Sequence, residues 1–67
     1  MILVHKATGQ PVKLGDAVRD FRGDPAKVTS WELPRHSGST GRVYVVTPEG
    51  WIQGYYPSVF DLEWRRG

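Results

Sequence analysis

The sequence predicts an all-β fold, a small barrel of five to six short strands with a one-turn 3-10 corner before the last strand. Two observations lead to this prediction. Eight glycines and five prolines fall at intervals between short runs of β-forming residues, and no helical period persists for more than a few residues. Closure into a barrel is expected because a small sheet has few other ways to protect its strand edges.

The chain has 67 residues, and we expect it to form one domain over residues 1–67. A chain this short buries only about 60% of the surface that its unfolded form exposes, so a few large side chains must supply the core. The aromatic residues, three Trp, three Tyr and two Phe, are the predicted source of that burial. The chain contains no cysteine, so neither disulfides nor thiolate metal sites are available to stabilise it.

The first half of the chain contains three predicted strands. Residues 2–6 form the first strand, and residues 17–21 form the second. Val18 and Phe21 of the second strand both face the core only if a bulge lies between them, because they are three positions apart. Residues 26–33 form the third strand, after a turn in which glycine supplies a positive φ and proline a fixed one.

The second half begins with a polar loop over residues 35–40, after Pro34 stops the third strand. Residues 42–47 form the most apolar strand. Residues 48–50 then make a tight turn into a strand over residues 51–56.

The last strand follows a one-turn corner at residues 57–59. Phe60, Leu62 and Trp64 alternate with charged residues, which is the pattern of a strand with one buried face. These three side chains are expected to lock the barrel.

Two motifs resemble known families. Residues 54–60, Gly-Tyr-Tyr-Pro-Ser-Val-Phe, resemble the end of SH3 domains, where a glycine, an apolar pair and Pro-Ser precede a single helical turn and the closing strand. Residues 14–18, Leu-Gly-Asp-Ala-Val, resemble the opening shared by many SH3-like barrels, including KOW-type nucleic-acid modules. The resemblance implies an SH3-like barrel.

Nearly the whole chain also resembles small proteins encoded in bacteriophages and prophages. The segments that carry this resemblance are GDAVRDFRG, STGRVYV and YYPSVFDLEW. It implies a phage-encoded accessory protein in the bacterial host cytosol, and it brings no established activity with it.

Aromatic side chains are the first candidate binding surface. The chain has more of them than a core of this size can hide, because strand alternation turns some outward. In SH3 domains such rings line a shallow groove for extended, proline-rich peptides. We therefore predict a protein partner bound by Trp31, Tyr44, Trp51, Tyr55, Tyr56 and Pro57. The alternative is that the rings wrap a small core and its rim.

Basic side chains suggest a second kind of partner. The net charge is +2 and the isoelectric point is near 9.3, which permits an acidic partner. Arg35 and Arg42 flank a polar loop whose amides and hydroxyls suit a phosphate, and exposed rings can stack on unpaired bases. A nucleic acid would be bound by Arg22, Lys27, Arg35 and Arg42. The competing interpretation is a mixed-charge surface that only keeps the protein in solution.

The sequence predicts no enzyme, no cofactor and no metal site. His5 and His36 have no metal-binding spacing, and the serines lack a nucleophile-elbow context. Asp16 and Asp20 would lie about 13 Å apart on an extended strand, which is too far for paired acid–base work. Asp16 and Asp24 are interpreted as turn residues. A chain this small also has little room for a ligand pocket of roughly 300 Å³.

No apolar run approaches the roughly 18 residues of a membrane span, and the short apolar start differs from a signal peptide. We expect a cytoplasmic protein that is not exported and has no membrane partner. Three hypotheses follow for its function. The chain is a protein-interaction module, a nucleic-acid-binding barrel, or a weak homodimer formed through an edge strand or the aromatic face; as a binding module it would be a monomer or weak homodimer.

Overall fold

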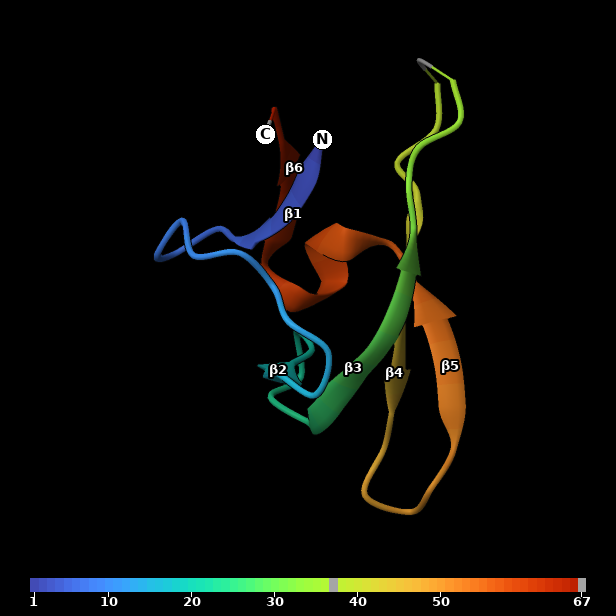
Figure 1. Ribbon diagram of the computed structural model, residues 1–67. Helices are drawn as coiled ribbons and strands as arrows, with labels where there is room; N and C mark the ends of the chain where they lie inside the picture. The colour runs from blue at the N-terminus through green and yellow to red at the C-terminus, as the bar shows by residue number, and fades with distance from the viewer. Residues whose placement is uncertain (37, 67) are drawn as a thin grey trace.

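The computed structural model describes residues 1–36 and 38–66. These residues form six strands and one 3-10 helix, so the all-β prediction and the one-turn corner before the last strand are confirmed (Figure 1). The elements are β1 (Ile2–His5), β2 (Ala17–Arg19), β3 (Pro25–Glu32), β4 (Arg42–Val46), β5 (Ile52–Tyr55), η1 (Pro57–Phe60) and β6 (Leu62–Arg65). Within the described residues, no helix has the length and apolar character needed to cross a bilayer.

The strands of the described residues form two antiparallel sheets. The first and last strands, β1 and β6, pair with each other, and β2, β3, β4 and β5 follow one another as a four-stranded meander. Figure 1 shows η1 between the β1–β6 ladder and the four-stranded sheet, with the two chain ends close together at one end of the ladder. The short links of the meander are those that antiparallel neighbours permit.

The two sheets are not closed into a barrel, so the predicted closure is wrong. Two features keep the sheets apart. Residues 6–16 form turns and an isolated bridge between Val4 and Pro11, with no long strand to join the sheets. Pro57 begins η1 and has no N–H to donate, so the β5 ladder stops just before it. The strands β2 and β5 therefore remain as the edges of the four-stranded sheet.

Aliphatic side chains build the core between the two sheets. Val43 and Val45 of β4 are at most 1% exposed. The buried cluster consists of Leu3, Val12, Val18, Ala26, Val28, Val43, Val45, Phe60 and Leu62. The prediction that the aromatic residues supply the burial is wrong, because Phe60 is the one aromatic residue in this cluster. Trp31 and Trp64 pack against its rim instead.

The corner between β5 and β6 depends on Pro57 and Asp61. Tyr56 is extended, with φ −68° and ψ 145°, as a residue before proline prefers. Asp61 is left-handed with φ 58°, and its N–H donates to the carbonyl oxygens of Pro57 and Ser58. Phe60 thus lies in η1 and not in the last strand, although its side chain faces the core as predicted.

The second strand is shorter than predicted because a turn begins earlier. The Asp20 carboxylate accepts hydrogen bonds from the N–H groups of Arg22 (2.8 Å) and Asp24 (3.0 Å). Such side-chain bonding to the backbone stabilises a turn at the expense of a strand. Phe21 lies in this turn and is 78% exposed, so its predicted place in the core is wrong.

The bulge lies in β3 and not in the second strand. Val28 pairs with Val45, and Ser30 pairs with Tyr44, so Thr29 is the extra residue. The Thr29 hydroxyl donates a hydrogen bond to the Tyr44 carbonyl oxygen (3.1 Å). As a result Val28 faces the core, while Ser30 lies with Tyr44 on the other face of the sheet.

The loop between β3 and β4 is attached to β6 near its end. The Trp64 indole N–H donates to the Thr40 carbonyl oxygen over 2.7 Å. Gly41 is buried with φ 67°, and a Cβ there would lie 2.5 Å from the Glu32 carbonyl oxygen. Ser37, in the predicted polar loop, lies outside the described residues.

Candidate functional site

The four-stranded sheet has one face on the core and one face in solvent. Val43 and Val45 of β4 are buried on the core side. Their neighbours Tyr44 and Val46 therefore lie on the opposite side, because successive strand residues alternate. We call this opposite side the outer face.

Two cross-strand pairs connect β4 and β5 on the outer face. Tyr44 lies opposite Gly54, and Val46 lies opposite Ile52. Ile52 is 67% exposed, and Val46 is half-buried. Apolar side chains in such pairs contact each other across the ladder. The outer face therefore carries a continuous apolar strip over β4 and β5.

Tyr44 is held in place at both ends of its side chain. Its ring covers Gly54, where a Cβ would lie 2.7 Å from the Tyr44 Cε1 atom. Its hydroxyl donates a 2.7 Å hydrogen bond to the Glu32 carboxylate. This hydrogen bond raises the pKa of Tyr44 above its ordinary value, because ionisation of the phenol would place two negative charges together.

Arg42 and Tyr56 extend the strip toward the loop after β3. The Arg42 guanidinium carbon lies 5.5 Å from the centroid of the Tyr56 ring, which is a cation–π distance. Tyr56 is 55% exposed, so most of its ring is available to a partner. The outer-face strip consists of Arg42, Tyr44, Val46, Ile52, Gly54 and Tyr56.

The strand β5 is at the edge of the sheet in the described part of the chain. The Thr47 N–H donates to the Trp51 carbonyl oxygen over 2.8 Å, which fixes the alternation of the ladder. The odd-numbered residues of β5 direct their N–H and C=O groups toward β4. The even-numbered residues, Ile52 and Gly54, direct theirs away from β4, toward the free edge.

The free edge of β5 lacks the protection that edge strands usually have. Residues 50–60 contain no charged side chain, and Trp51 at the start of the strand is 68% exposed. The strand β2 carries Arg19, and β6 carries Glu63 and Arg65. Charged side chains on an edge discourage pairing with another chain. Among these strands, β5 is the one whose edge carries no charge.

Three of the six predicted partner-binding residues lie near this edge. Tyr44 and Tyr56 belong to the outer-face strip, and Trp51 follows the β4–β5 turn. Val46, Ile52 and Gly54 belong to the outer-face strip with Tyr44 and Tyr56 and were missed from the sequence. Counting residue pairs outward from the turn at residues 48–50 gives the register of the two strands, and that register places these three residues on the outer face.

The other three predicted residues do not lie on the outer face. Trp31 is half-buried against the core cluster. Tyr55 packs edge-on against Phe60, with ring centroids 5.5 Å apart, and its hydroxyl hydrogen-bonds to Gln53. Pro57 is buried, so its side chain is not available as a contact. The structure therefore does not bring the six residues together on one surface.

The four predicted nucleic-acid-binding residues are also divided. Arg35 and Arg42 line one depression of about 450 Å³ together with Tyr56. Arg22 lies over the ring of its neighbour in the turn after β2, beside the carboxylates of that turn. Lys27 lies on β3 opposite a residue of β2 and a residue of β4. Lys27 therefore lies on the outer face with Arg42 but at the other end of β4, and of the four residues only Arg35 and Arg42 line the same depression.

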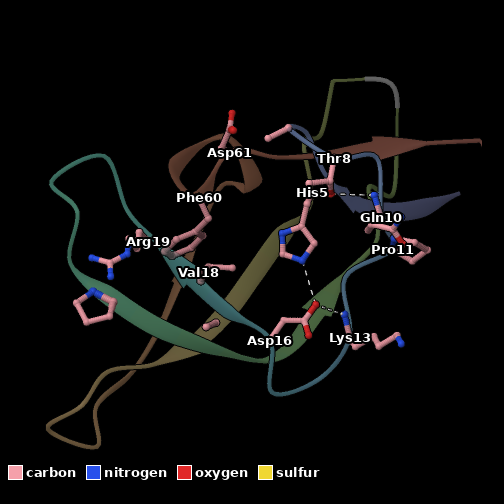
Figure 2. Close-up of a pocket in the computed structure, with 13 residues that line it drawn as sticks. His5, Thr8, Gln10, Pro11, Lys13, Asp16, Val18, Arg19, Phe60 and Asp61 are labelled. Atoms are coloured by element: carbon pink, nitrogen blue, oxygen red, sulfur yellow. Dashed lines mark hydrogen bonds and ion pairs between the residues drawn. The ribbon is translucent and has the colours of Figure 1, made fainter.

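An open depression of about 720 Å³ lies between the end of β1, the start of β2 and η1 (Figure 2). We predicted little room for a ligand pocket of roughly 300 Å³; this depression exceeds that volume but is open to solvent. His5 Nε2 lies 3.0 Å from Asp16 Oδ2 at its side. The Lys13 N–H also donates to Asp16 Oδ2 (2.9 Å). No sequence pattern predicts the His5–Asp16 pair, which joins residues eleven positions apart.

The His5–Asp16 pair connects β1 to the turn before β2. The hydrogen bonds from His5 and from the Lys13 N–H lower the pKa of Asp16 below its ordinary value. Asp16 thus occupies a turn, as predicted, and in addition fixes the first strand to the four-stranded sheet. Among the described residues, no group of three or more His, Cys, Asp or Glu side chains is placed to hold a metal ion.

The chain was compared with protein-family models, curated proteins and solved structures, and none of them matches. The functional argument therefore depends on the geometry of β5 and the outer-face strip.

Proposed function

We propose that the chain is a non-catalytic binding module that binds a protein partner along β5. The observation that carries this proposal is the combination of a free strand edge with exposed apolar side chains and no charge over residues 50–60. An extended partner segment would add to the sheet as a further strand. Its backbone would bond to the even-numbered residues of β5, and its side chains would contact the outer-face strip.

We further propose that the fold is an SH3-like arrangement that is left open. The pairing of the first and last strands and the one-turn η1 between β5 and β6 support this proposal. The likeness of the sequence to phage and prophage proteins supports a role as a phage-encoded accessory factor in the bacterial cytosol.

The proposal is tested with a displayed library of random peptides selected on the immobilised chain. Selected peptides are expected to be extended segments with alternating apolar residues, because a strand presents every second side chain to one face. Their binding is then measured on two variants that each place a lysine at an exposed apolar position. Ile52→Lys puts a charge beside the free edge, and Leu14→Lys, at a residue of equal exposure, is the matched control.

Ile52→Lys is expected to abolish peptide binding, and Leu14→Lys is expected to leave it intact. The proposal fails if no peptide is enriched, or if the selected peptides bind both variants equally. Binding should depend weakly on salt, since the contacts are apolar and backbone hydrogen bonds.

A second candidate function is the binding of single-stranded nucleic acid. The observation that favours it is the depression shared by Arg35, Arg42 and Tyr56, which places two cations beside an exposed ring. A titration with single-stranded and duplex oligonucleotides at low salt tests it. Affinity should fall steeply with salt and should drop on Arg42→Gln, because phosphate contacts release counterions. Absence of binding at low salt would eliminate this function.

A further inference from the structure

The free edge of β5 is complementary to itself. We propose that its protein partner is a second copy of this chain, with two β5 strands antiparallel about a twofold axis at Gly54. This inference rests on the proposed function, because it names the partner of the same strand edge.

Symmetry and hydrogen bonding together select this register. A twofold axis perpendicular to the sheet makes the two strands antiparallel and keeps each residue on its own face. The free N–H and C=O groups belong to the even-numbered residues of β5. The bonded pairs must therefore join even-numbered residues, and centring them on Gly54 gives the longest overlap before Pro57 ends the strand. Gly54 then faces Gly54, and Ile52 of each copy faces Tyr56 of the other.

The side chains fit this register on the outer face. Ile52 is 67% exposed and Tyr56 is 55% exposed, so each has apolar surface to bury against the other. An aliphatic residue opposite an aromatic ring is a favourable cross-strand pair. The axis itself passes Gly54, which has no side chain and is covered by the Tyr44 ring of its own copy. The pairing therefore brings no two bulky groups into the same place.

Charge explains why the second copy suits this edge and not the other edges. Charged side chains on a strand edge discourage pairing with another chain. Residues 50–60 carry no charge, whereas β2 carries Arg19 and β6 carries Glu63 and Arg65. The strand β1 also carries no Asp, Glu, Lys or Arg, but residues 10–12 bond to its other edge, where the His5 N–H donates to the Gln10 carbonyl oxygen and the Val12 N–H to the Leu3 carbonyl oxygen. Of the edge strands in the described residues, β5 is therefore the one that is both uncharged and open.

The association is expected to be weak. The Tyr56 carbonyl oxygen already accepts a 3.0 Å hydrogen bond from the Val59 N–H, so Tyr56 contributes mainly its own N–H. The overlapping segment is short, and stable interfaces bury about 1,200–2,000 Å² in total. The chain exposes 4854 Å², so a single added strand pair covers only a small part of its surface.

Sedimentation velocity over roughly 1 µM to 1 mM tests the proposal, since weak association lies in that range. The wild-type chain and Leu14→Lys are expected to shift from monomer to dimer as concentration rises. Ile52→Lys is expected to stay monomeric, because two lysines would flank the paired strands. A monomer at every concentration, or a dimer that Ile52→Lys leaves unchanged, would overturn the proposal.

Cysteine cross-linking tests the register. The chain has no native cysteine, so the introduced cysteines can form disulfides only with each other. Ile52→Cys mixed with Tyr56→Cys is expected to form a disulfide under mild oxidation, because residues directly opposite have Cα atoms within bridging distance. Each variant alone should cross-link much less, since identical positions are then offset along the strands. Equal cross-linking by either variant alone would contradict a twofold axis at Gly54.

The two proposals fail in different ways. If sedimentation gives only a monomer while selected peptides bind and are lost on Ile52→Lys, the second copy is the wrong partner and the β5 binding edge stands. If neither peptides nor a second copy depends on Ile52, the binding edge itself is wrong.

Discussion

The ring of Tyr44 lies across Gly54 on the neighbouring strand, so closely that a Cβ on residue 54 would meet the ring at 2.7 Å. The two residues form a pair of the ladder in which side chains approach most closely. Because Gly54 has no side chain, the Tyr44 ring can occupy the space above it. This contact fixes the surface of β5 that we propose as the binding edge.

Gly54→Ala is expected to destabilise the chain by about 1–3 kcal/mol, the usual cost of adding a methyl group to a filled space. Gly54 does not have a positive φ, so the cost comes from the clash with Tyr44 and not from backbone strain. Urea unfolding measures it. Gly38→Ala is the matched control, because the nearest atom to its added Cβ lies 3.6 Å away. Equal stability of Gly54→Ala and wild type would show that the ring is free to move.

Tyr44 is expected to ionise at a higher pH than an ordinary tyrosine. Its folded-state pKa is raised above the ordinary value of 10.0 by the hydrogen bond to Glu32. The stabilisation that accompanies this shift is present below pH 10 and is lost as the pH rises through the raised value. An ultraviolet titration should show a phenol transition above pH 10 that Glu32→Gln moves to lower pH. A titration curve that Glu32→Gln leaves unchanged would contradict the contact.

The stabilising contribution of Asp16 is expected to be lost in acid. Its folded-state pKa is lowered below the ordinary value of 3.8, so its contribution is complete above that pH and is lost as the pH falls through the lowered value. Unfolding free energies measured at decreasing pH should therefore fall more steeply for wild type than for Asp16→Asn. Parallel profiles for wild type and Asp16→Asn would remove His5–Asp16 as a stabilising link.

Trp64→Phe is expected to cost about 0.5–1.5 kcal/mol, because it removes the hydrogen bond from the indole N–H to the Thr40 carbonyl oxygen. Trp51→Phe is the matched control at a tryptophan that is 68% exposed, and should change stability by less than about 0.5 kcal/mol. Chemical unfolding of the two variants decides the point. If both variants lose the same stability, the bond to the loop contributes nothing specific.

The elements that depend on local chemistry were predictable from the sequence. The turn at residues 48–50 and the alternation of β4 predicted the central hairpin, and Pro57 predicted the corner before β6. Phe21 lies in a turn and not in the predicted strand, because the Asp20 carboxylate accepts hydrogen bonds from the N–H groups of Arg22 and Asp24. In an exposed turn, side-chain bonding to the backbone decides the conformation.

The relationships that depend on distant segments were not predictable. Barrel closure requires a ladder between segments far apart, and no local pattern reports whether residues 6–16 extend or turn. The His5–Asp16 pair arises because β1 packs beside the start of β2. About half of the candidate site was predicted. Tyr44, Trp51 and Tyr56 were predicted as contact residues because they are aromatic. Ile52 and Gly54 emerge only from the register of the ladder.

The central claim is that the even-numbered residues of β5 offer free backbone groups to another strand. Residue-resolved amide hydrogen exchange tests this most directly, with the chain compared at roughly 1 µM and 1 mM, the limits of weak association. We predict that the Gln53 and Tyr55 amides are protected at both concentrations. The Gly54 and Tyr56 amides should exchange rapidly in the dilute sample and become protected in the concentrated one. Rapid exchange of Gly54 and Tyr56 at both concentrations would contradict strand pairing between copies, and their protection in the dilute monomer would contradict the free edge itself.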